Sequence, residues 1–84
     1  MSAFVYRLIG PRPTFAVDMT DGRVVAIGPV DDPAGSYGLA IVLADDLAQV
    51  EALRDGDPAV LSPHGLRVEI APMFRLVTPS GTYG

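Results

Sequence analysis

The stretch that decides the fold is GRVVAIGPVDDPAGSYGLAIVLADD, residues 22–46. It holds two short apolar runs, residues 23–27 and 37–43, separated by a segment rich in glycine, proline and aspartate. Short runs with many β-branched residues are typical of buried strands. Glycine adopts unusual backbone angles and proline fixes its own, so both favour turns. We therefore predict two strands joined by a loop that begins at Gly28 and Pro29.

Composition excludes several classes of function. The chain has 84 residues, a net charge of −4, six arginines, no lysine and no cysteine. Nucleic-acid binding needs clustered positive charge, and these arginines are scattered singly along the sequence. The absence of cysteine excludes disulfides, zinc–thiolate sites and cysteine nucleophiles, and is compatible with a cytoplasmic protein. No apolar run approaches the roughly 18 residues of a membrane span, so we expect no membrane partner.

The flanking segments complete an α+β plan. An aspartate at position 45 or 46 is suited to cap a helix, and Gln49 lies at capping-box spacing from Asp46. Gly56 is placed to end that helix. We predict a strand over residues 3–9, an extended crossover over 10–21, a helix to Asp55, a strand over 66–70 and an extended run over 73–77. The result is one domain, residues 1–77, with a ferredoxin-like antiparallel sheet, one main helix and no first helix; residues 78–84 are expected to form a flexible tail.

Several of these segments resemble a known family. GRVVAIGPV, DPAGSYGLAIV, GDPAV and the RVEI-AP strand, together with the opening YRLIGPRPTFAVDMT, resemble the YciI-related (YCII-domain) family over about residues 3–73. The resemblance implies a dimeric α/β barrel, in which the ferredoxin-like sheets of two subunits pack together. It therefore implies a homodimer or a higher homo-oligomer.

The chain departs from the family at one place. Members of this branch follow the Asp-Met-Thr element with a helix of several turns that carries a histidine, whereas here Thr20-Asp21 runs straight into Gly22. The histidine that is proposed to act with the aspartate of the Asp-Pro motif is absent with that helix. That aspartate, Asp57, is our first catalytic candidate, and a helix N-cap before Pro58 is the alternative. His64 is the second candidate, as a replacement partner for Asp57 or simply as a loop histidine.

The remaining candidates would bind a ligand. Arg7 is a charge in the middle of an apolar strand, so it must reach solvent or a partner; it either binds an anionic group in a cleft or sits at a barrel rim or dimer contact. Tyr6 and Tyr37 either cap a pocket with their hydroxyls or pack in the core. Gly28 and Pro29 are the last two ligand-binding candidates. Neither aspartate pair, 31–32 or 45–46, has the ligand spacing of a metal site, so we expect no metal and no cofactor.

These observations favour a small, cytoplasmic, YciI-like homodimer that is non-catalytic or vestigial. We expect it to bind a small apolar or aromatic metabolite in the cleft between sheet and helix. The alternative is an acid–base enzyme, of the isomerase or lyase (dehydrochlorinase) type, acting on a small cyclic or phenolic metabolite. In that case Asp57 would be the base, with His64 or Arg7 assisting. A shortened chain with no independent function is a third interpretation.

Overall fold

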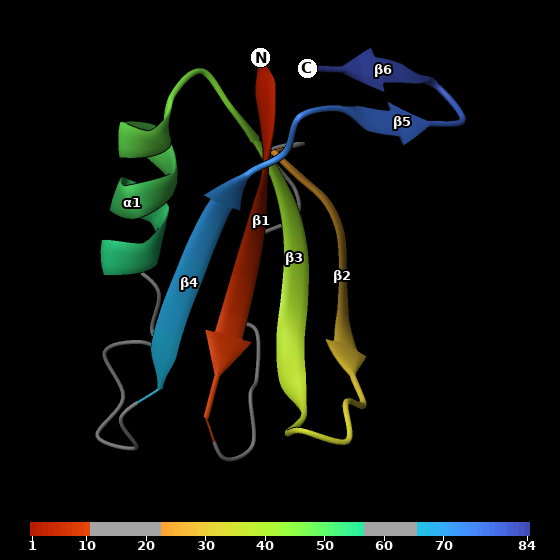
Figure 1. The fold of residues 1–84 in the computed structure, drawn as a ribbon. Coiled ribbons are helices and arrows are strands. Elements are labelled where there is room, and N and C mark those ends of the chain that lie inside the picture. Colours follow the sequence, from red (N-terminus) through yellow and green to blue (C-terminus); the bar gives the residue numbers. More distant parts are fainter. Residues whose placement is uncertain (11–22, 57–65) are drawn as a thin grey trace.

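The computed structural model describes residues 1–10, 23–56 and 66–84 (Figure 1). The elements in chain order are β1 (Ser2–Ile9), β2 (Val24–Val30), β3 (Tyr37–Ala44), α1 (Leu47–Asp55), β4 (Arg67–Pro72), β5 (Leu76–Thr78) and β6 (Gly81–Tyr83). The strands of the main sheet lie in the order β2-β3-β1-β4, and every neighbouring pair is antiparallel. The prediction of an α+β fold with an antiparallel sheet is confirmed, and this arrangement is compatible with a ferredoxin-like fold. The expected extended crossover, residues 10–21, lies outside the described residues except for Gly10.

The side chains of β1 alternate between the two faces of the sheet. Phe4, Tyr6 and Leu8 are buried on one face, and Val5 and Arg7 alternate onto the other. This alternation follows from the two-residue period of a strand. The core forms on the first face, where Phe4 and Tyr6 pack with Val50 of α1 and with the following residues of β2 and β3: Val24, Ala40, Val42 and Ala44. We call the second face the open face.

Strand β2 is longer than the sequence predicts. It runs through Gly28 and Pro29 to Val30, so these two residues lie in the strand and not in the loop. Proline interrupts a ladder because it lacks an N–H, but β2 is an edge strand, where a missing donor on the outer side costs nothing. The register of β2 shifts between Val24 and Ala26. This irregularity lets Val24 enter the core while Ala26 pairs with Ile41 of the open face.

Helix α1 begins and ends as its sequence predicts. The N-cap is Asp46, whose Oδ1 accepts a hydrogen bond from the backbone N–H of Gln49 at 3.0 Å. The Gln49 side chain reaches back to accept from the backbone N–H of Asp45 at 2.9 Å. At the other end, the N–H of Gly56 donates to the carbonyl of Ala52 at 3.2 Å. The contacts at Gln49 N–H and at the Ala52 carbonyl satisfy terminal backbone groups of the helix, and the contact at Asp45 holds the residue before the cap.

The two neighbouring aspartates give a direct test of the cap. Asp46→Ala should lower the free energy of unfolding by about 1 kcal/mol, because the N–H of Gln49 loses its acceptor. Asp45→Ala removes the same charge, but it deletes only a 3.4 Å contact to the Gln49 amide nitrogen. We expect that control to change stability by less than about 0.5 kcal/mol. Urea denaturation of both variants measures the difference, and equal losses would contradict this assignment of the cap.

The C-terminal residues form a two-stranded hairpin, in which Leu76 pairs with Tyr83 and Thr78 with Gly81. The hairpin extends from the end of β4, beyond the end of the main sheet (Figure 1). The segment that the sequence leads us to expect as a flexible tail, residues 78–84, includes β6. Phe74, just before the hairpin, is 94% exposed. None of the helices in the described ranges has the length and apolar character needed to cross a membrane.

Candidate binding site on the open sheet face

The central residues of the open face are apolar except for Arg7. They are Val5, Arg7 and Ile9 of β1 and Tyr37, Leu39, Ile41 and Leu43 of β3. All of them are half-buried except Leu43, which is buried. Within the described part of the chain, α1 is the element that packs on the sheet, and it packs on the opposite face. An antiparallel sheet with one face in water normally carries polar residues on that face, so an aliphatic open face calls for a covering partner or ligand.

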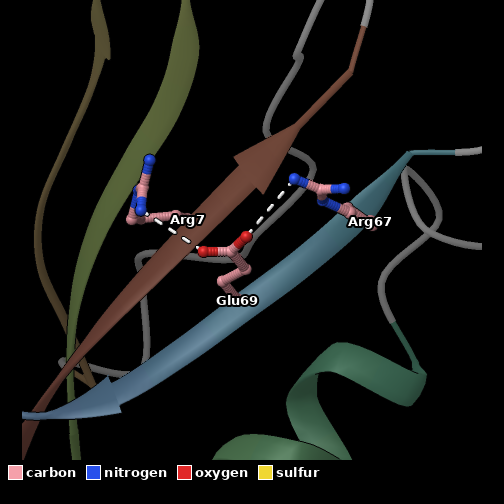
Figure 2. A network of polar contacts seen from close by, with 3 residues as sticks. All are labelled: Arg7, Arg67 and Glu69. Carbon is pink, nitrogen blue, oxygen red and sulfur yellow. Dashed lines mark hydrogen bonds and ion pairs between the residues drawn. The ribbon is translucent and has the colours of Figure 1, made fainter.

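A cluster of charges interrupts this apolar surface at Arg7. The Glu69 carboxylate of β4 lies between two arginines (Figure 2). Its Oε2 is 3.3 Å from Nη1 of Arg7 and its Oε1 is 3.4 Å from Nη2 of Arg67. Charge-assisted hydrogen bonds are usually about 2.7–2.9 Å long, so both contacts are loose. The side chains of Arg7 and Glu69 are 39% and 49% exposed, and such pairs add little stability.

Tyr37 holds the Arg7 guanidinium from another side. The central carbon of the guanidinium lies 4.3 Å from the centroid of the Tyr37 ring, a cation–π contact. The Arg7 Nε is buried and has no hydrogen-bond partner among the described residues. A buried N–H without an acceptor costs about 1–3 kcal/mol, so an acceptor supplied to this atom by a ligand or partner would be favourable.

Three of the five predicted ligand-binding residues share the open face. Arg7 pairs across the sheet with Leu39, and Leu39 pairs in turn with Gly28. Tyr37 occupies the next row on the same face, opposite Ile9. A Cβ added at Gly28 would meet no atom within 4 Å, so the sheet surface beside Leu39 is open there.

The other two predicted ligand-binding residues lie elsewhere. Tyr6 is 0% exposed and belongs to the core, because its strand position places it on the α1 side of the sheet. Pro29 pairs with Gly38 and so belongs to that side too. The predicted set is therefore divided between two faces, and only its open-face members can act together.

The described residues on the helix side of the sheet line a small cavity. A cavity of about 40 Å³ lies there, lined by Arg23, Val24, Val42, Leu43, Ala44, Gln49 and Leu53. Pockets for organic ligands are usually about 300–1,000 Å³ in volume, whereas a single water needs only about 10–15 Å³. The cavity can hold water but not an aromatic ring. This cavity is therefore too small for the ligand that the sequence predicts between sheet and helix, and the open face is the alternative surface for it.

The catalytic candidates Asp57 and His64 lie outside the described residues. Both aspartate pairs contribute to local structure. Asp32 accepts a hydrogen bond from the backbone N–H of Ala34 at 2.8 Å in the β2–β3 loop, and Asp46 caps α1. No group of three or more histidine, aspartate or glutamate side chains in the described ranges is arranged to hold a metal ion.

Two residues of the charge cluster are absent from the candidates that the sequence suggests. Arg67 and Glu69 alternate with Val68 in a pattern that predicts only a strand with one wetter face. Their meeting with Arg7 depends on the pairing of β1 with β4, in which Arg7 lies opposite Glu69. The two positions are 62 residues apart in the chain. No local spacing in the sequence indicates this contact; the one signal for it is the presence of opposite charges on two predicted strands.

Comparison of the chain with protein-family models, with curated proteins and with solved structures gave no match. Any functional assignment therefore rests on the residues of this chain.

Proposed function

We propose that the protein is a small YciI-like homodimer, non-catalytic or vestigial, that binds a small apolar or aromatic metabolite between the open faces of its two copies. The observation that carries the proposal is the aliphatic open face, centred on Val5, Leu39 and Ile41, on which no described element packs. The resemblance to the YciI-related family supports it, because the dimeric α/β barrel places the sheets of two subunits together. The absence of the histidine-bearing helix from the sequence supports a non-catalytic role.

A second copy is the partner that suits this surface best. A two-fold interface uses the same patch twice, so the patch must be compatible with itself. The open face combines mostly aliphatic central residues with charges of both signs, Arg7 in β1 and Arg67 and Glu69 at the β4 edge. Two such faces can bury their centres while the charges of each edge remain near solvent or near opposite charges of the other copy. At 84 residues the chain also has a small core, which makes burial in an oligomer valuable.

Sedimentation velocity tests the assembly directly. At micromolar concentration we expect a single species of twice the 8.8 kDa chain mass. The reason is that association removes the aliphatic side chains of β1 and β3 from water, the main favourable term in protein assembly. Because the burial of apolar side chains does not depend on charge pairs, the dimer should persist when salt is raised from about 0.1 M to about 1 M, where exposed charge pairs are screened. A strictly monomeric protein under both conditions would overturn the proposal.

A further inference from the structure

The Arg7 cluster has a net charge opposite in sign to that of the whole protein. The chain carries a net charge of −4, whereas Arg7, Arg67 and Glu69 together carry two positive charges and one negative. The one carboxylate is shared between both arginines at distances longer than a good charge-assisted hydrogen bond. The cluster therefore has room, in charge and in hydrogen-bond donors, for one more anion.

The geometry of Arg7 indicates which kind of anion. A guanidinium presents five N–H groups in a planar fork, which matches the two oxygens of a carboxylate. Glu69 is bound through Nη1, whereas Nε and Nη2 form a different edge of the guanidinium. Nε is the atom without a partner among the described residues. Stacking on Tyr37 restrains the plane of the group and leaves its edges available for hydrogen bonds.

The surroundings indicate the rest of the ligand. Leu39 separates Arg7 from Gly28 along one row of the sheet, and the absence of a side chain at Gly28 leaves that end of the row open. The next row, on the side of the N-terminal end of β1, holds Val5 and Ile41, which are both aliphatic. A flat apolar body can lie along these residues while its charged end reaches Arg7.

We propose that the ligand of the open face is a small aromatic or aliphatic monocarboxylic acid, with its carboxylate on the Nε–Nη2 edge of Arg7. This inference rests on the proposed function, since the second copy supplies the other wall of the site. The carboxylate supplies the acceptor that Nε lacks. Because Nε is buried in the free chain, binding at this edge requires the Arg7 side chain to turn, and the 3.3 Å contact to Glu69 is loose enough to adjust.

A charged and a neutral probe of the same shape test the inference. Benzoate and benzamide are titrated into the full-length protein, and binding is followed by the shifts of backbone amide resonances. We expect benzoate to bind about tenfold more tightly than benzamide, because only benzoate forms the charge-assisted fork. In Arg7→Gln this preference should fall to within about twofold. The matched control is Arg75→Gln, which removes the same charge from an exposed position between β4 and β5 and should keep the preference.

The possible outcomes distinguish a failure of the carboxylate assignment from a failure of the proposed function. If the dimer binds both probes equally, the carboxylate assignment is overturned and the proposed function stands. If an intact dimer binds neither probe, both are overturned. If Arg7→Gln weakens the dimer and benzoate leaves the spectrum unchanged, the acceptor on Arg7 belongs to the second copy and the assignment is overturned. Should Arg7→Gln fail to fold, Arg7→Lys keeps the charge but loses the fork, and a full retention of the benzoate preference would contradict the proposal.

Discussion

Ile41→Glu should convert the proposed dimer into a folded monomer, whereas Ile27→Glu should leave that dimer intact. The two isoleucines lie on neighbouring strands of one sheet but on opposite faces. Ile41 pairs with Val5 on the open face, and Ile27 pairs with Ala40 on the helix side. In the proposed dimer, Ile41→Glu would bury a carboxylate without a partner, at a cost of several kcal/mol.

The same experiment identifies the interface if another surface is used. Ile27 is 39% exposed on the helix side of β2, so it also belongs to an apolar surface available to a partner. Sedimentation velocity of both variants gives their oligomeric states, and circular dichroism shows whether they remain folded. If Ile27→Glu dissociates the dimer and Ile41→Glu does not, the subunits meet through the helix side and the proposed open-face site is wrong.

Much of the fold can be predicted from the sequence because each element depends on residues that are close together in the chain. The period of β1 separates Tyr6 from Arg7, and Asp46 with Gly56 marks both ends of α1. The error at Gly28 and Pro29 has a physical reason: both residues favour turns in general, but an edge strand tolerates a proline on its outer side. The sequence does not reveal in advance that β2 is an edge.

The candidate site is harder to predict because it depends on register. Tyr6 and Arg7 are adjacent in one strand, so the two-residue period alone places them on opposite faces and excludes a shared pocket. The sequence suggests grouping them only because both carry polar atoms in an apolar segment. The residues that do meet Arg7 come from β3 and β4, and only the pairing of distant strands brings Tyr37 and Glu69 to it. A one-residue slip in either pairing would move them to the other face.

Tyr6 belongs to the core and Tyr37 to the open face, so their replacement should have very different effects. Tyr6 is fully buried among Phe4, Ala40 and Val42, so Tyr6→Ala leaves a large cavity and should cost about 3–5 kcal/mol of unfolding free energy. That is a large part of the total stability of a small domain, which is about 5–15 kcal/mol. We therefore expect Tyr6→Ala to be unfolded or to have a much lower urea midpoint.

Tyr37→Ala should cost far less, about 1 kcal/mol, because Tyr37 is half-buried and what it loses is chiefly the stack on Arg7. Its main effect should instead be on ligand binding, since the guanidinium is no longer held in one plane and the preference for benzoate over benzamide should shrink. Both variants are compared by urea denaturation at one fixed protein concentration, because the stability of a dimer depends on concentration. Equal destabilisation by the two replacements would place Tyr37 in the core with Tyr6 and would remove the basis for a site on the open face.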